Sequence, residues 1–197
     1  ALEALRQPME NSRVTISRAG GSITYPSRIM AVAAMNPCPC GYYGHPDGPC
    51  TCTPTAIKRY LGRVSGPLLD RLDIQVEVAP VRYEDLASTA REEGSAAIRE
   101  RVAAARKLQQ RLAPYGESCN ARIPAGALGE VCPLMPAADR MLKMAFERLN
   151  LSGRAYDRLL KIARTIADLA GSERIDTPHI TEAIQYRSLD RKYWTGA

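Results

Sequence analysis

Four of the six cysteines lie in one short segment rich in glycine and proline. They form two C-x-C pairs separated by nine residues: Cys38, Cys40, Cys50 and Cys52. Four thiolates in two close pairs can complete a tetrahedral Cys₄ zinc site, so we expect structural Zn²⁺ here, with His45 and Asp47 as spare ligands. The spacing departs from the usual C-x-x-C, and four reduced cysteines in a surface loop is the alternative interpretation.

Three polar residues stand at the ends of predicted elements, where they could meet a bound ligand. Asn36 ends a predicted buried strand, Arg71 lies between a helix and a strand, and Arg154 lies in the first turn of a helix. A guanidinium suits the charge that develops in phosphoryl transfer. The alternatives are an ordinary Asn-Pro turn, a local ion pair of Arg71 with Asp70 or Asp73, and a solvated basic helix face.

A fourth candidate, Arg18, is the only charged residue within three positions of the tip of a predicted hairpin. A basic residue on a projecting hairpin suits contact with a nucleic-acid backbone, although an exposed turn has the same pattern. The net charge of +6 permits binding of polyanions without demanding it. The basic composition therefore leaves both interpretations open.

The first 80 residues are predicted to be rich in strands. Alternation on both sides of Ala19-Gly20-Gly21 predicts a β-hairpin over 14–25, with glycine supplying a positive φ. The apolar run 29–35 is typical of a strand buried on both faces, and residues 74–78 indicate another strand. Residues 1–10 read as the end of a helix that Pro8 terminates.

The remainder of the chain has helical periodicity, so we place a domain boundary near Pro80. A first helix carries an apolar stripe made of Ile98, Val102, Ala105, Leu108 and Leu112, and a long connection follows over 114–135. Three further helices are predicted to begin at Pro136, after Ser152-Gly153, and at a Thr177 cap. The third of the four helices should bury Leu159, Ile162, Ala163, Ile166 and Leu169.

Several enzymatic motifs are absent from the sequence. There is no G-x-x-x-x-G-K-[ST] phosphate loop, no H-E-x-x-H, no G-x-S-x-G, and there are two histidines in all. We therefore expect part of a catalytic site and not a complete one. No apolar run approaches the roughly 18 residues that cross a bilayer, and no signal peptide is recognised, so a cytoplasmic protein without membrane contact is expected.

Long stretches of the sequence resemble one family. They are LEALRQPMENSRVTISRAGGSITYPSRIMAVAAMNPCPCGYYG, CTCTPTAIKRYLGRVSGPLLDRLDIQVEV, LSGRAYDRLLKIARTIADLAG and HITEAIQYRSLDR. These stretches resemble the magnesium-chelatase-like AAA+ ATPases of the competence ComM/YifB type. The resemblance implies that the Walker A and Walker B motifs lie upstream of the first residue here. It implies an α/β plus all-α fold: the C-terminal part of an AAA+ core over 1–80, with the hairpin and the cysteine loop, and a helical lid over 81–197.

The same resemblance assigns roles to the candidate residues. Asn36 would be the sensor-1 residue that orients the attacking water, and Arg71 the arginine finger that reaches a neighbouring subunit's nucleotide. Arg154 would be the sensor-2 residue on the γ-phosphate, and Arg18 would line the pore of a ring. The whole protein would then be a hexameric motor that uses ATP and Mg²⁺ to translocate branched or single-stranded DNA, as a branch-migration helicase in natural transformation.

Two other functions stay open at this point. The whole protein could instead be an ATPase subunit that remodels a protein or a metal-chelatase partner without DNA. The chain could also act alone as a zinc-stabilised module that binds nucleic acid. By itself the chain is predicted to be inactive as an ATPase, to bind DNA weakly at best and not to form a stable hexamer.

Overall fold

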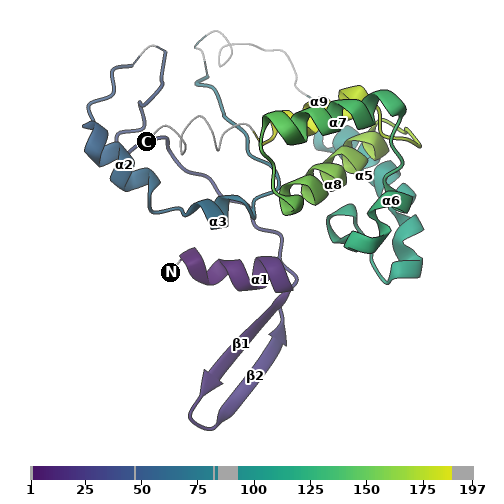
Figure 1. Ribbon diagram of the computed structural model, residues 1–197. Helices are drawn as coiled ribbons and strands as arrows, with labels where there is room; N and C mark the ends of the chain where they lie inside the picture. Colours follow the sequence, from purple (N-terminus) through teal and green to yellow (C-terminus); the bar gives the residue numbers. More distant parts are fainter. Residues whose placement is uncertain (1, 47, 82, 84–92, 188–197) are drawn as a thin grey trace. The chain divides into compact units, whose positions relative to one another are not determined.

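A computed structural model describes residues 2–46, 48–81, 83 and 93–187 of the chain (Figure 1). The described residues divide into two compact units, one within residues 1–80 and the other within 81–187. The first holds a β-hairpin and short helices, and the second is mostly helical. The expectation of a mixed part followed by a helical part is therefore confirmed in this coarse form.

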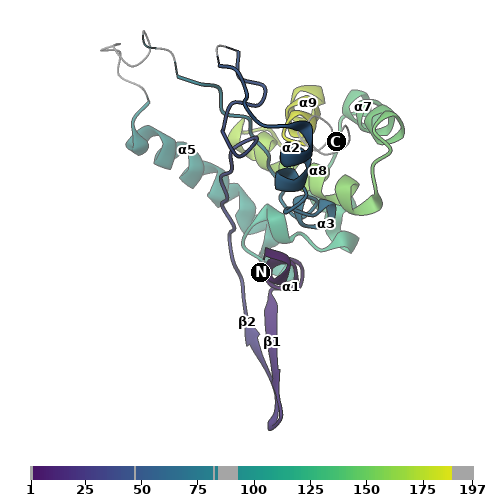
Figure 2. The ribbon, with the colours of Figure 1, turned by 90° about the vertical axis from the view of Figure 1, so that its left-hand side faces the viewer.

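The β-hairpin of the first unit has the position that the sequence predicts. Strands β1 (Arg13–Arg18) and β2 (Gly21–Pro26) are antiparallel, and Arg18 pairs with Gly21 across a two-residue turn (Figure 2). The positive φ, +136°, is at Gly21, immediately after that turn. Glycine adopts this backbone conformation without steric cost, which fixes where the chain reverses.

The two faces of the hairpin differ in chemistry. On one face, hydroxyls pair across the strands, Thr15 with Thr24 at 3.0 Å and Ser17 with Ser22 at 2.8 Å. The other face carries the apolar pairs Val14–Tyr25 and Ile16–Ile23. Ile16, Ile23 and Tyr25 are exposed, so the ribbon is held by backbone bonds and cross-strand pairs.

Short helices make up the other regular elements described in the first unit: η1 (Leu2–Leu5), α1 (Arg6–Asn11), α2 (Pro54–Leu61) and α3 (Gly66–Leu69). Thr53 and Ser65 cap α2 and α3, since each hydroxyl accepts a backbone N–H three residues later. The prediction that Pro8 ends the first helix is wrong. Pro8 lies in the first turn of α1, where the missing N–H has no intrahelical acceptor to lose.

The strands predicted at 29–35 and 74–78 are not formed. Both segments lack regular secondary structure, and Met30, Val32 and Val78 are 90%, 86% and 84% exposed. A strand of this kind needs hydrogen-bonding neighbours on its edges and helices on its faces. The described residues supply neither, because the sheet they form consists of β1 and β2.

The second unit is built from helices of very different length. Its elements are α5 (Ser95–Leu108), η2 (Gln109–Tyr115), η3 (Asn120–Arg122), η4 (Ala125–Ala127), α6 (Leu128–Val131), α7 (Pro136–Arg148), α8 (Gly153–Leu169) and α9 (Thr177–Gln185). The predicted connection over 114–135 is therefore not irregular throughout. The starts of α7 and α8 agree with the sequence prediction, and Ser152 caps α8 by accepting from the Ala155 N–H at 3.2 Å.

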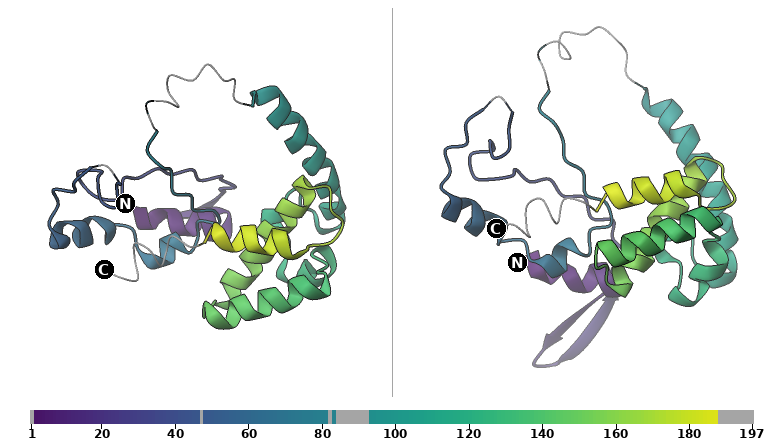
Figure 3. Two further views of the ribbon diagram at one scale, coloured as in Figure 1. Left: turned by 90° about the horizontal axis from the view of Figure 1, so that it is seen from above. Right: turned by 45° about the horizontal axis from the view of Figure 1, so that its top comes forward.

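Helix α8 lies at the centre of this unit. It packs against α5, α6 and α9, and α7 packs against α9 (Figure 3). The largest fully buried apolar side chains of the core are Leu112, Ile123, Leu142, Leu159, Ile175 and Ile180. The predicted inner face of α8 is largely confirmed, although its last member, Leu169, is 42% exposed.

Two other predictions about helix faces and ends need correction. In the first stripe Ala105 and Leu112 are buried, but Ile98, Val102 and Leu108 are 41%, 45% and 45% exposed. Only part of that stripe is therefore covered by the described residues. Helix α9 is capped by Asp176 and not by Thr177, because the Asp176 carboxylate accepts from the Thr177 N–H at 2.7 Å. A carboxylate is favoured at a helix N-terminus.

A buried polar network fastens α8 to the elements around it. Asp168, whose side chain is fully buried, accepts from Arg111, Asn120 and Arg164 at distances between 2.7 and 3.0 Å. Arg164 also donates to the backbone oxygens of Ser172 and Glu173 beyond the helix end. The carboxylate is thus fully partnered, which a buried charge requires. Among the described helices, none is long and apolar enough to span a membrane.

Candidate functional site

The cysteine loop spans residues 36–53, and its described part, 36–46 and 48–53, folds through tight turns. The Gly41 N–H donates to the Cys38 carbonyl at 3.1 Å, and Gly41 and Gly44 have φ of +86° and +79°. Gly48 is needed for a different reason, because a Cβ there would lie 2.4 Å from the ring of Tyr42. These glycines let the loop return on itself and bring its two ends together.

The fold of this loop gathers the four cysteines that the sequence singled out. The Sγ atom of Cys38 lies 3.3 Å from that of Cys40 and 3.7 Å from that of Cys50, and Cys40 and Cys50 are 3.6 Å apart. Cys52 completes the cluster, in which all four Sγ atoms lie within 4.8 Å of one another. Cys38 is buried and the other three are half-buried.

The cluster is electrostatically crowded. Backbone N–H groups of Tyr42 and Thr51 lower the pKa of Cys40 to about 5. The Cys40 N–H acts in the same direction on Cys52, but burial and the neighbouring thiols outweigh it and raise the pKa of Cys52 to about 12. Several thiolates this close repel one another, so they ionise together only beside a cation.

The donor set fits a tetrahedral thiophilic cation. Zinc–sulfur bonds of about 2.3 Å in a tetrahedron place sulfurs about 3.8 Å apart, close to the 3.3 to 3.7 Å observed. The Tyr43 N–H donates to the Cys38 Sγ at 3.3 Å, the kind of outer contact that orients a metal ligand. His45 packs against the ring of Tyr42 at 5.4 Å and is not part of the cluster. Asp47 lies outside the described residues.

Asn36 lies at the entrance of the cysteine loop, two residues before Cys38. Its side chain is exposed and faces Gly41, where a Cβ would be 3.9 Å from the Asn36 Nδ2. Asn36 is thus held beside the cysteine cluster by chain connectivity and by this close approach. The conformation of the cysteine loop therefore determines where the Asn36 amide lies.

Arg71 follows α3, and both terminal nitrogens of its guanidinium donate hydrogen bonds. Nη1 donates to the Pro67 backbone oxygen and Nη2 to the Glu10 carboxylate of α1. The Arg71 side chain is only 9% exposed. An ion pair of Arg71 was one sequence interpretation, with Asp70 or Asp73 as the expected partner; the structure shows an ion pair with Glu10, 61 residues away.

Arg18 is the last residue of β1, at the tip of the hairpin and exposed. The pairing of Arg18 with Gly21 places it on the same face as Ile16 and Ile23. A long charged side chain therefore ends the apolar face of the ribbon, next to the turn.

Arg154 belongs to the other compact unit, where it is exposed in the first turn of α8. Its helix begins at the Ser152 cap, so the partial positive charge of the helix N-terminus lies beside this guanidinium. The guanidinium and the helix N-terminus would both attract an anion. Arg154 thus lies in the first turn of a helix, as the sequence predicts.

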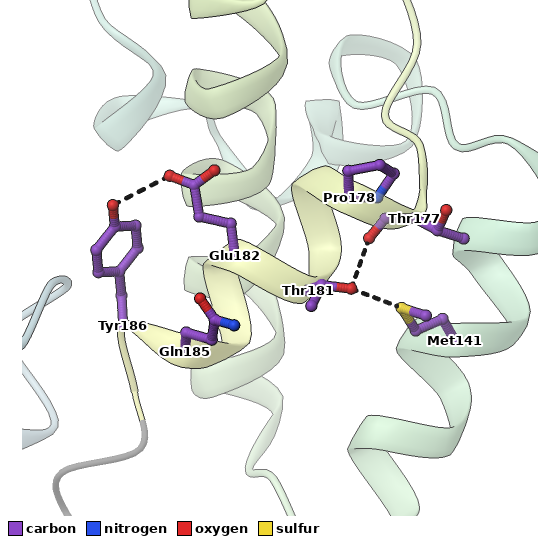
Figure 4. Close-up of a pocket in the computed structure, with 7 residues that line it drawn as sticks. All are labelled: Met141, Thr177, Pro178, Thr181, Glu182, Gln185 and Tyr186. Carbon is purple, nitrogen blue, oxygen red and sulfur yellow. Dashed lines mark hydrogen bonds between the residues drawn. The ribbon is translucent and has the colours of Figure 1, made fainter.

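An open pocket in the second unit is formed by α7 and α9 (Figure 4). Two of its hydroxyls contact other lining residues: the Tyr186 hydroxyl donates to Glu182 at 3.0 Å, and the Thr181 hydroxyl lies 3.3 Å from the Met141 sulfur. None of the residues predicted to be functional lines this pocket. It adds nothing to the candidate site.

Sequence reasoning missed Glu10 and the acceptor network around Asp168. Glu10 has its arginine partner 61 residues away, and Arg111 lies 57 residues from Asp168. Arg164 is only four residues before Asp168 on α8, and this spacing is the local signal that could have found the network. Two cysteines lie outside the cluster: Cys119 is half-buried, and Cys132 is buried. Burial raises the pKa of Cys132 to about 11.

Comparison with family models finds two matches along the chain. The model described as magnesium chelatase, subunit ChlI, matches residues 1–86. The model described as magnesium chelatase, subunit ChlI C-terminal, matches residues 92–187. The two matched regions correspond closely to the mixed and the helical units.

Comparison with curated proteins finds relatives along nearly the whole chain. Competence protein ComM of Haemophilus influenzae is 42% identical over 191 residues, which are 96% of this chain and 36% of the relative. The uncharacterised protein YifB of Salmonella typhimurium is 40% identical over 96% of this chain and 37% of the relative. An uncharacterised protein of Mycobacterium tuberculosis is 38% identical over 95% and 37%. The chain spans little more than a third of the length of these relatives.

Proposed function

Because the two ChlI models match successive regions of the chain, it belongs to the magnesium chelatase ChlI-like family, and we propose that it forms part of an AAA+ motor. In this proposal residues 1–80 are the C-terminal part of the ATPase core and residues 81–197 are its helical lid. The whole protein assembles into a ring, hydrolyses ATP with Mg²⁺ and moves DNA, branched or single-stranded. The 42% identity to a competence protein over 96% of the chain carries the proposal.

The proposed active site is divided between neighbouring subunits. Asn36 orients the water that attacks the γ-phosphate, and Arg154 contacts that phosphate within its own subunit. Arg71 reaches the nucleotide of the next subunit, where its charge offsets the negative charge that develops as the bond to the leaving phosphate breaks. Hydrolysis then depends on assembly, because no subunit alone holds all three groups against one nucleotide.

The anchored state of Arg71 supports its part in this scheme. An arginine held by a carboxylate and a carbonyl oxygen keeps its charge and a fixed plane, which suits recognition of a phosphate oxygen. An unanchored surface arginine would lose more side-chain entropy on ordering. The structure of this residue is thus compatible with a preorganised electrostatic role.

The hairpin is the proposed DNA contact. Arg18 at its tip supplies a cation for backbone phosphates, and six such hairpins around a ring would act together. The competing function is an ATPase that remodels a protein or a metal-chelatase partner without DNA. The hairpin distinguishes the two, because only the DNA motor should lose stimulation by DNA when the charge of Arg18 is reversed.

A second proposal concerns structural zinc in the cysteine loop. The observation that supports it is the set of Sγ separations of 3.3, 3.7 and 3.6 Å among Cys38, Cys40 and Cys50. When bound, the ion would hold the two ends of a loop that has little apolar core of its own. The four cysteines would hold it, and Asn36 would be placed by the loop so formed.

The experiment for the motor is ATP turnover by the full-length protein and its Arg71→Ala variant. We expect turnover to fall by about 10³-fold or more, as for arginine fingers generally, while nucleotide binding changes little. Arg63→Ala, on a neighbouring exposed arginine that packs on Tyr60, is the matched control. Normal hydrolysis by the Arg71→Ala protein would refute the assignment.

A further inference from the structure

The contact between Arg71 and Glu10 joins two elements that are far apart in sequence. Glu10 lies in α1, and Pro67, which accepts from the other terminal nitrogen of Arg71, lies in α3. The side chains of Arg71 and Glu10 are 9% and 36% exposed. The guanidinium is therefore fixed in place by acceptors on two sides, one charged and one neutral.

A second contact joins α3 to η1, the short helix that directly precedes α1. The Ser65 hydroxyl, which caps α3 by accepting from the Leu68 N–H, also donates to the Glu3 carboxylate at 2.5 Å. This hydrogen bond lowers the pKa of Glu3. The segment that carries Glu10 and the segment that carries Arg71 are thus tied at two points, so the carboxylate has a defined place relative to the arginine.

Not all N–H donors of the Arg71 guanidinium have an acceptor. A guanidinium has five N–H donors, and two of them serve Pro67 and Glu10. The Nε atom is buried and has no hydrogen-bond partner in the structure. A buried charged donor without an acceptor is costly, and an oxyanion is the acceptor that matches the remaining planar donors best.

We propose that Glu10 is the positioning residue of Arg71: it holds one terminal nitrogen so that the remaining donors are oriented before a phosphate arrives. The inference rests on the proposed function, since the phosphate is that of a nucleoside triphosphate bound by a neighbouring subunit. Glu10 itself does not touch the nucleotide. Its carboxylate keeps the guanidinium plane fixed, and the Pro67 oxygen fixes the other end.

The test is steady-state ATP hydrolysis by the full-length protein with Glu10→Gln, measured at protein concentrations that saturate assembly. The amide keeps the size of the side chain and removes its charge. We expect kcat to fall about tenfold or more with KM changed less than about twofold, because orientation of Arg71 matters in the transition state and not for ground-state binding. Glu77→Gln is the matched control, because it makes the same charge change at an exposed glutamate of the same unit, and its kcat should stay within about twofold.

A double variant separates positioning from a structural role. If Glu10 acts through Arg71, adding Glu10→Gln to Arg71→Ala changes kcat by less than about twofold. If Glu10→Gln lowers kcat in the Arg71→Ala background by the same factor as in the parent protein, the proposal is overturned, because Glu10 would then act independently of Arg71. If Glu10→Gln fails to fold, as judged by its thermal melting, Glu10→Asp is used in the same cycle.

Two other results would also overturn the proposal. Unchanged kcat in Glu10→Gln would show that the ion pair has no part in hydrolysis. A rise in kcat, or a lower protein concentration for half-maximal turnover, would show that the carboxylate competes with the phosphate. Failure of the motor proposal itself is distinguishable, because in that case Arg71→Ala alone would already hydrolyse ATP normally.

Discussion

Asp168 accepts from both terminal nitrogens of Arg111, at 3.0 and 2.8 Å, although the two residues are 57 positions apart. The Asp168 side chain is fully buried and that of Arg111 is 30% exposed. The pair fastens η2 to α8, and Asn120 and Arg164 add donors to the same carboxylate. The helical unit is therefore organised around one buried charge and its partners.

Asp168→Asn should destabilise the helical unit strongly. The amide removes the negative charge and leaves Arg111 and Arg164 facing a group that itself donates. Breaking one side of a buried ion pair costs about 3–5 kcal/mol, to be measured by urea unfolding. Asp157→Asn, the same change elsewhere on α8, should cost less than about 0.5 kcal/mol. Equal losses in the two variants would contradict a special role for the network.

Zinc binding by the cysteine loop should be stoichiometric and should depend on the cluster. Protein purified with zinc is expected to retain about one equivalent, and Cys50→Ser should lose it because three thiolates close the site poorly. Cys119→Ser removes a half-buried cysteine that is not in the cluster and should retain the metal. The zinc content of each protein is measured by atomic absorption. Retention of zinc by Cys50→Ser would argue against a four-sulfur site.

Cys132 should resist alkylation at moderately alkaline pH. Burial raises the pKa of its thiol to about 11 from an ordinary value of 9.0, so the folded thiol is still protonated at pH 8. Iodoacetamide should label it at least about tenfold more slowly than in denaturant, because the thiolate is the nucleophile. Mass spectrometry of the labelled peptide measures both rates, and equal rates would contradict the burial.

The same shift predicts how stability depends on pH. A raised pKa in the folded state means that the folded chain binds more protons than the unfolded chain between about pH 9 and 11. The contribution of the protonated Cys132 thiol to the free energy of unfolding is thus complete below pH 9 and is lost as the pH rises toward 11. Thermal melting of Cys132→Ala beside the parent should show a weaker alkaline decline in the variant.

Reversing the charge at the hairpin tip should affect DNA contact specifically. In the full-length protein, Arg18→Glu is expected to abolish the stimulation of ATP turnover by DNA and to leave basal turnover unchanged. Loss of one phosphate contact should also reduce the salt dependence of DNA binding, by about one unit of log–log slope per contact. Arg13→Glu, at the base of the same strand, is the control and should retain stimulation.

Local signals predicted local structure well. The hairpin needed only alternation and a glycine at its turn, and α7 and α8 needed only Pro136 and the Ser152 cap. The segments 29–35 and 74–78 were predicted as strands from apolar character alone. A strand depends on neighbours that its own sequence does not contain, and the described residues do not provide them.

In the candidate site, too, the local features were predictable from the sequence and the long-range contacts were not. The four cysteines are close in sequence, so their spacing was enough to predict their meeting. The partner of Arg71 was not predictable in this way, because the adjacent Asp70 and Asp73 were the obvious carboxylates and Glu10 is 61 residues away. Long-range ion pairs follow from the packing of elements, here α1 against the segment around α3, and no spacing rule encodes that.

ATP turnover by the full-length protein, with and without branched DNA, tests the central claim most directly. A DNA motor should hydrolyse ATP several-fold faster with DNA present, and Arg71→Ala should eliminate turnover in both conditions. Turnover that is indifferent to branched and to single-stranded DNA would contradict the DNA motor. That result would favour a protein or chelatase partner as the substrate and would leave the hairpin a structural element.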